Sequence, residues 1–390
     1  MFRETSPGPI TLGPLGPLGP LVALAAAAAL AACGGDGGPS QGTVTPGGVT
    51  IDLSGCPAAQ YTESVTACVP AATDYQPRKG VPAANGWPTC VSDDNAFHLI
   101  GDGIPPAAAR SAAFEAMGPL LWRNPNPPSK AEFLAARDDY SVTEGLASRI
   151  ARRQDVHYAE VPGDDKFACA QAGIPAQYPD RCAGPAKLKP LIDDAFVKGA
   201  AQTQPRVQAA RIEAALLWFF YLSMTSEVWT CGFDDITDCD AAAGYYTQIS
   251  VRASPLGLGR YVAAIGQETH DRVYDGLLAE RCWRDLDKAM PAVSATKYYQ
   301  LAQAQLDKAT LRGEALILRQ RIGLVGCASG EYQLAQLEFV KVLGGLLDHG
   351  AGLRDAANAA KLKAYTANPT TDASAIAAAQ AAIDAIFGCP

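Results

Sequence analysis

Histidine is scarce in this sequence, and the residue spacings of several common metal sites are missing. The four histidines lie far apart, and none belongs to the H-E-x-x-H pattern of zinc peptidases or the E-x-x-H pattern of di-iron helical bundles. No two cysteines have the C-x2-C spacing of a zinc site. We therefore expect no cofactor, apart from the calcium candidate at residues 234–240.

Concentrated positive charge is also lacking. Asp and Glu number 40 against 32 for Lys and Arg, and the net charge is −8. Basic residues never occur in runs longer than two, as at Arg152-Arg153. A protein that binds a nucleic-acid backbone needs a concentrated basic face. We therefore expect no nucleic acid among the partners.

Apolar runs are short, and the one nearest the N-terminus covers residues 21–32. It has the length of a signal-peptide core and falls short of the roughly 20 residues of a membrane-spanning helix. The run ends in Leu30-Ala31-Ala32-Cys33, which resembles the bacterial lipobox. The resemblance implies that residues 1–32 are a signal peptide and that Cys33 carries lipid, such as palmitate. The alternative is an ordinary secretory signal cleaved near Ala32, which leaves Cys33 as a free thiol.

Residues 33–50 have hardly an apolar side chain to bury, and their Gly, Pro, Ser and Thr content is typical of a flexible tether. In the Gram-negative lipoproteins that such a lipobox resembles, an Asp directly after the lipidated cysteine favours the inner membrane. This chain has Gly34 at that position. We therefore expect a lipid anchor in the bacterial cell envelope, at the outer membrane, with the protein facing either the periplasm or the exterior.

Ten cysteines follow Cys33, an even number that suits an oxidising compartment. We expect up to five disulfides among Cys56, Cys68, Cys90, Cys169, Cys182, Cys231, Cys239, Cys282, Cys327 and Cys389. The short separations favour three local pairs, which are Cys56–Cys68, Cys169–Cys182 and Cys231–Cys239. The other four cysteines would then form links between distant parts of the chain.

The remaining chain divides into an irregular part and a helical part. Residues 51–105 are rich in Pro, Gly and Asn and predict a loop-rich segment that holds three cysteines. Residues 106–390 show helical periodicity, and residues 214–224 are apolar on all sides, which predicts a buried helix. No stretch alternates apolar and polar residues over enough positions to indicate a sheet. We predict an all-α fold, an irregular bundle of about eight to eleven helices stapled by disulfides, with a subdivision near residue 200.

The densest group of polar side chains lies between Cys231 and Asp240. Four carboxylates occur there within seven residues, at Asp234, Asp235, Asp238 and Asp240. Several oxygen ligands on one loop are what calcium favours, although the pattern of an EF-hand is absent. The alternative is that these aspartates cap and solvate the start of a helix near Ala241.

Two functions from different classes remain open. The first is a binding or structural module that engages an envelope protein, a polymer or a small ligand. The second is an uncommon extracytoplasmic hydrolase that uses the carboxylates at residues 234–240, with or without a bound cation. The failure of the common catalytic patterns favours the binding module.

Overall fold

The computed structural model describes residues 53, 55–64, 68–77, 86–142, 144–163, 167–233, 235–249, 251–288, 290 and 292–390. The expected signal peptide, the expected tether with Cys33, and Asp234 of the acidic loop lie outside these residues. The described part contains thirteen α-helices and no strand, which confirms the all-α prediction. Eleven of these helices have nine or more residues, while α3 and α4 are single turns.

The helices follow one another along the chain, and the longest connection, residues 151–173, lies between α3 and α4. In chain order they are α1 (Pro106–Leu120), α2 (Lys130–Ser141), α3 (Leu146–Ile150), α4 (Ile174–Gln177), α5 (Lys189–Ala200), α6 (Pro205–Phe233), α7 (Asp238–Thr247), α8 (Gly257–Ile265), α9 (Gln267–Leu286), α10 (Ala292–Cys327), α11 (Gly330–Arg354), α12 (Ala356–Ala367) and α13 (Ala373–Ile386). Short 3-10 turns occur at η3 (Val91–Asp94) and η4 (Ala168–Ala170), and a π-turn, η5 (Gly184–Leu188), leads into α5. The first helix thus begins where the irregular segment was expected to end.

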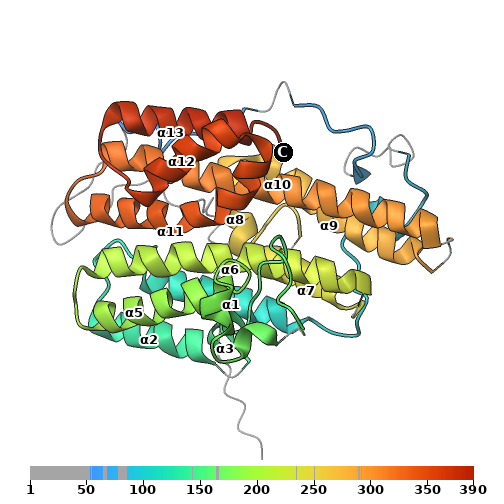
Figure 1. Cartoon of the computed structure of the whole chain (residues 1–390), viewed down its shortest axis with the longest axis horizontal. Coiled ribbons are helices and arrows are strands. Elements are labelled where there is room, and N and C mark those ends of the chain that lie inside the picture. Colours follow the sequence, from blue (N-terminus) through green and yellow to red (C-terminus); the bar gives the residue numbers. More distant parts are fainter. Residues whose placement is uncertain are drawn as a thin grey trace, which may run out of the picture. The chain divides into compact units, whose positions relative to one another are not determined.

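Figure 1 shows the described helices in two groups, with α1, α2, α5, α6 and α7 on one side and α10 to α13 on the other. Helix α6 packs against α5 and α7 in its own group and against α11 in the other. Helix α10 packs against α9, α11 and α13. The two long helices α6 and α10 therefore organise the two groups.

The middle of helix α6 is buried because residues 214–224 are apolar on every face. Leu216, Phe219, Phe220 and Leu222 are completely inaccessible to solvent, as the apolar run at residues 214–224 predicts. They belong to one continuous hydrophobic core that also contains Phe114 and many side chains of α10 to α13.

The ten cysteines form five disulfides, and two of the three expected local pairs are among them. Cys169 pairs with Cys182 and Cys231 with Cys239, with Cα atoms 5.3 Å apart in both. The expected Cys56–Cys68 pair is wrong, because Cys56 pairs with Cys327 and Cys68 with Cys389. The remaining pair is Cys90–Cys282.

The long-range pairing of Cys56 and Cys68 has a simple physical reason. The irregular N-terminal segment runs along the C-terminal helices, so its cysteines meet partners that are 192 to 321 residues away in sequence. Buried polar contacts accompany these crosslinks. The Glu63 carboxylate accepts hydrogen bonds from Arg312 and Thr269, and the side chain of Gln305 bonds both backbone groups of Tyr75. The segment is thus a packed part of the domain.

Candidate functional site

A polar cavity of about 480 Å³ lies beside the Cys231–Cys239 loop. Its charged side chains come from four separate parts of the chain: Arg149, Arg152, Arg153 and Glu160 in and after α3, Arg181 in a later loop, Glu227 on α6, and Asp235 and Asp238 near the start of α7. The volume lies within the range of small-ligand pockets. The cavity is therefore the candidate functional site.

The wall of the cavity formed by residues 151–158 is held in place by Arg181. Its guanidinium donates to the Gln154 side chain at 2.8 Å and to the backbone carbonyl oxygens of Asp155 and Tyr158 at 3.1 and 3.0 Å. The neighbouring Cys169–Cys182 disulfide links the segment that carries Arg181 to the turn η4. A loop of little regular structure is thereby ordered next to the cavity.

A buried ion pair forms the floor of the site. Arg153 Nη2 donates to Glu227 Oε1 at 2.7 Å, and the two side chains are 6% and 8% exposed. The same guanidinium lies 5.6 Å from the ring centroid of Tyr245. Burial opposes the ionisation of Glu227, but the charge of Arg153 and its hydrogen bond outweigh burial, so the pKa of Glu227 is lowered.

Asp238 forms a carboxylate pair with Glu227. Burial is the main reason why the pKa of Asp238 rises to about 7, and the negative charge of Glu227 and a hydrogen bond between the two side chains add to it. The Cys231–Cys239 disulfide joins the end of α6 to the start of α7 and holds this pair together. Near neutral pH the pair can offer both a proton donor and an ionised acceptor to a ligand.

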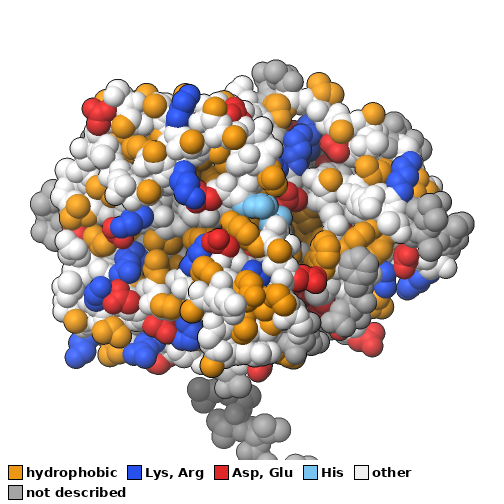
Figure 2. Space-filling view, viewed as in Figure 1, with side chains coloured by type: hydrophobic (Ala, Val, Ile, Leu, Met, Phe, Trp, Pro, Cys, Tyr) orange, Lys and Arg blue, Asp and Glu red, His pale blue; other side chains and the backbone are white. Residues whose placement is uncertain are grey.

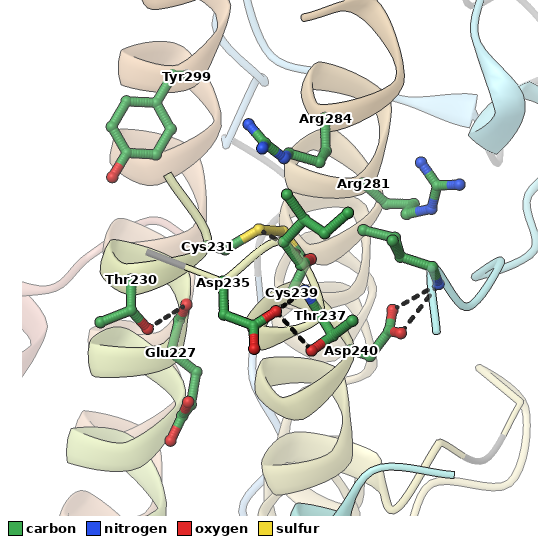
Figure 3. Close-up of a disulfide and its surroundings, with 12 residues drawn as sticks. Glu227, Thr230, Cys231, Asp235, Thr237, Cys239, Asp240, Arg281, Arg284 and Tyr299 are labelled. Atoms are coloured by element: carbon green, nitrogen blue, oxygen red, sulfur yellow. Dashed lines mark hydrogen bonds between the residues drawn. A yellow bond between two sulfur atoms is a disulfide. The ribbon is translucent and has the colours of Figure 1, made fainter. Parts of the chain in front are cut away.

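The described aspartates of the acidic loop, Asp235, Asp238 and Asp240, do not converge on one point. Asp235 accepts hydrogen bonds from the backbone N–H and the hydroxyl of Thr237, at 2.9 and 2.8 Å. Asp240 is buried and accepts from the backbone N–H groups of Ile100 and Gly101, both at 2.9 Å, on the far side of the helix from Asp235 (Figure 3). Of these three described aspartates, Asp235 and Asp238 line the cavity and Asp240 does not.

No described residues form a group of three or more His, Cys, Asp or Glu side chains fit to hold a metal ion. The alternative interpretation, that the aspartates stabilise the start of a helix, agrees better with the positions of Asp238 and Asp240. Helix α7 begins at Asp238, three residues earlier than expected, so Asp238 and Asp240 occupy its first turn, where negative charge is favourable. The N-cap residue is Thr237, which makes no side-chain capping bond.

Two exposed aromatic side chains border the cavity, and sequence reasoning missed both. Trp229 on α6 and Phe167 in the loop before η4 are each 45% exposed. The four arginines were missed as well. Arg149, Arg152 and Arg153 lie close together in sequence, and the fold adds Arg181, which no local pattern in the sequence links to them.

The histidines divide between the core and an exposed hollow. His270 is buried, accepts a hydrogen bond from Tyr246 at Nδ1 and donates to the Arg252 carbonyl oxygen, and burial lowers its pKa. His157 lies between the carboxylates of Asp155 and Asp307, at 2.8 and 3.2 Å. Burial opposes its protonation, but the two carboxylates raise its pKa to about 10. Figure 2 shows histidine in a hollow at the centre of one face, next to acidic side chains.

No family model, curated protein or solved structure matches this chain. None of the described helices combines the length and the apolar composition that crossing a bilayer requires. The function must therefore be argued from the cavity and its side chains.

Proposed function

We propose that this protein is an exported lipoprotein whose disulfide-stapled helical domain binds a small polar ligand in the cavity between α3, α6 and α7. The observation that carries the proposal is the cavity itself, which brings charged side chains from four separate segments around one space of about 480 Å³. Convergent polar groups in a concave site are the usual mark of a ligand pocket. An envelope protein or polymer is the alternative occupant.

Export is supported by the crosslinks. All ten cysteines after Cys33 have a disulfide partner, and such bonds persist in oxidising compartments outside the cytosol. The proposal of a lipid anchor rests on the lipobox-like residues 30–33, and that of the outer membrane on Gly34.

The anchor can be tested separately from the ligand. Cells that express the full chain are grown with an alkyne-tagged palmitate, and the Cys33→Ser variant is the matched control. We expect the label on the wild-type protein and none on the variant. Equal labelling of both proteins contradicts lipidation at Cys33.

Ligand binding can be tested by thermal unfolding of the mature protein that carries Cys33→Ser. A compound that binds only the folded state raises the melting temperature. The probes are amino acids, dicarboxylates, phosphate and neutral sugars. Ser226→Trp places a large side chain among the lining residues, whereas Ser141→Trp adds the same ring to the exposed end of α2. We expect at least one probe to stabilise the parent and the Ser141 variant but not the Ser226 variant.

A hydrolase is the second candidate, and one observation favours it. Asp238, with its pKa raised to about 7, lies beside the ionised Glu227, which is an arrangement that general acid and base catalysis uses. A screen of esterase, peptidase and glycosidase substrates tests this candidate. Activity that disappears in Asp238→Asn supports it, and activity that survives this substitution assigns the reaction to another site.

Calcium is a further proposal for the same loop. Asp235 and Asp238 both line the cavity, and carboxylate oxygens are the ligands that calcium prefers. Unfolding is measured with EDTA and then with calcium. A rise in melting temperature that Asp235→Asn abolishes supports a calcium site, and an unchanged melting temperature at about 1 mM calcium contradicts it.

A further inference from the structure

We infer that the ligand of this cavity is a small zwitterion, a free amino acid or a short peptide, whose carboxylate meets the arginine side of the lining and whose ammonium group meets the aspartate side. The inference rests on the proposed binding function and names its ligand class. Three features of the described residues carry it: the separation of charge across the lining, the balance of the two signs, and an arginine that has no ion-pair partner.

The separation of charge is the first feature. Three arginines of the lining lie within residues 149–153, in and directly after α3, while Asp235 and Asp238 lie at the start of α7. Glu227 on α6 lies between the two sides, because it bonds to Arg153 at 2.7 Å and also forms a hydrogen bond with Asp238. The lining is therefore positive beside α3 and negative beside α7.

The balance of the two signs is the second feature. Four guanidinium groups and four carboxyl groups line the cavity, and these belong to Arg149, Arg152, Arg153 and Arg181, and to Glu160, Glu227, Asp235 and Asp238. A ligand that displaces water from a charge loses free energy unless it supplies an opposite charge. An anion compensates only the arginine side, a cation only the aspartate side, and a neutral ligand neither. A zwitterion compensates both.

The third feature is Arg149, which forms no salt bridge and no side-chain hydrogen bond within the described chain. The other three arginines of the lining lie 2.7 Å from Glu227, 3.2 Å from Glu144 and 2.8 Å from the side chain of Gln154. The Nε atom of Arg149 is buried, so the terminal nitrogens are the atoms that a ligand can reach. Two terminal N–H groups of one guanidinium match the two oxygens of a carboxylate. Arg149 is thus the residue that binds the ligand carboxylate.

The aspartate side offers acceptors for an ammonium group. Asp235 is exposed and Asp238 is half-buried, and the Cys231–Cys239 disulfide holds the loop before α7 in place. An ammonium group has three N–H donors, and its hydrogen bonds to carboxylate oxygens are strong because both partners are charged. A positive charge here also offsets the repulsion between Asp238 and Glu227.

The experiment titrates the mature protein, as Cys33→Ser, with alanine, leucine, lysine, glutamate and alanyl-alanine, and measures binding by calorimetry. Phosphate, citrate and glucose are the probes of other classes. We expect at least one amino acid or the dipeptide to bind, and the comparison of the two shows which source of the zwitterion fits. Each zwitterion that binds is then titrated as its amide, which lacks the carboxylate, and as its N-acetyl derivative, which lacks the ammonium group. Both derivatives should bind about tenfold more weakly or worse, which corresponds to about 1.4 kcal/mol.

Two variants connect each ligand charge with its side of the cavity. Arg149→Gln and Asp238→Asn should each weaken zwitterion binding about tenfold or more. Arg149→Gln should bind the amide no more weakly than the parent does, because the amide has no carboxylate to lose, and Asp238→Asn should behave in the same way towards the N-acetyl derivative. Arg137→Gln and Asp102→Asn change exposed residues outside the lining, so they should bind the zwitterion like the parent.

Each outcome has one meaning. Binding of phosphate, citrate or glucose without binding of any zwitterion overturns the inference and leaves the proposed binding function intact. A zwitterion whose amide or N-acetyl derivative binds equally well also overturns it, because the ligand then uses at most one charge. Zwitterion binding that neither Arg149→Gln nor Asp238→Asn weakens places the ligand elsewhere. If a variant fails to fold, the derivatives titrated into the parent decide. No binding by any probe up to about 10 mM overturns both the inference and the proposed binding function.

Discussion

Arg153 and Glu227 form a buried ion pair, 2.7 Å from Nη2 to Oε1, that connects the loop after α3 to the middle of the domain. The partners are 74 residues apart in sequence, and their side chains are only 6% and 8% exposed. Each charge is tolerated in the interior because of the other. The pair also places the ionised oxygen of Glu227 beside Asp238, so it determines the electrostatics of the cavity.

Removal of one partner should be far more damaging than removal of both. We expect Arg153→Met to lower the free energy of unfolding by about 3 kcal/mol or more, because Glu227 then remains as an uncompensated buried charge. The double variant Arg153→Met, Glu227→Leu should recover much of this loss. Urea unfolding of the three proteins at neutral pH measures the difference. A single variant as stable as the parent contradicts the burial of the pair.

Asp238 should make folding stability fall as the pH rises. The pKa of Asp238 is about 7 in the folded protein, whereas the ordinary value, which applies to the unfolded chain, is 3.8. Between about pH 4 and pH 7 the folded state therefore binds more protons than the unfolded state. The contribution of Asp238 to the free energy of unfolding is therefore greatest below about pH 4 and declines up to about pH 7. Asp238→Asn should remove that part of the pH dependence.

The measurement compares parent and Asp238→Asn by urea unfolding at several values between about pH 4.5 and 8, so that all other titrating groups cancel in the difference. Asp102→Asn is the matched control, since Asp102 is exposed and is not among the charges that raise the pKa of Asp238. A stability difference between the parent and Asp238→Asn that does not change with pH would show that the pKa of Asp238 is ordinary.

Glu280 and Glu314 are buried carboxyl groups whose oxygens make no hydrogen bond within the described chain. They are 1% and 0% exposed, and burial raises both pKa values well above the usual range. We expect Glu314→Leu to stabilise the protein by about 1–3 kcal/mol, because an unsatisfied polar group is removed from the core.

The stabilisation from Glu314→Leu should be larger at pH 8 than at pH 5. The unfolded carboxyl group ionises above about pH 4.5, while the folded one stays protonated to a much higher pH, so a rising pH favours the unfolded parent. Thermal unfolding at the two pH values measures this. Glu338→Leu on α11 serves as the control at a residue that is only partly buried. A Glu314→Leu protein that is less stable than the parent at both pH values contradicts the claim that the buried carboxyl group of Glu314 makes no hydrogen bond among the described residues.

The Cys68–Cys389 disulfide should stabilise the domain more than the Cys169–Cys182 disulfide. The first closes a loop of 321 residues, shortened in practice by the Cys56–Cys327 crosslink, and the second closes a loop of 13. Chain entropy gives about 4 kcal/mol for the first and about 3 kcal/mol for the second. Paired Cys→Ser variants measured by urea unfolding test this order.

Hydrogen exchange of α13 gives an independent readout of the same crosslink. Loss of Cys68–Cys389 frees the end of the chain, so exchange should increase in α13 and leave α6 unchanged. Loss of Cys169–Cys182 should instead increase exchange in the loop around η4. Equal protection of α13 with and without Cys389 contradicts the role assigned to its disulfide.

The sequence by itself determined the features that depend on neighbouring residues. The apolar surface of residues 214–224 is a local property, so it predicted the buried part of α6 correctly. The start of the helical region near Pro106 and the pairs Cys169–Cys182 and Cys231–Cys239 are local in the same sense, because short loops bring nearby cysteines together at little entropic cost.

Only the tertiary structure decided which distant residues meet. Cys56 pairs with Cys327 because the N-terminal segment packs along the end of α10. Asp238 meets Glu227, while Asp240 turns to Ile100, although the two aspartates are only two residues apart at the start of α7. These partners depend on how whole helices pack, and packing is set by the sum of many weak contacts across the core rather than by any local pattern.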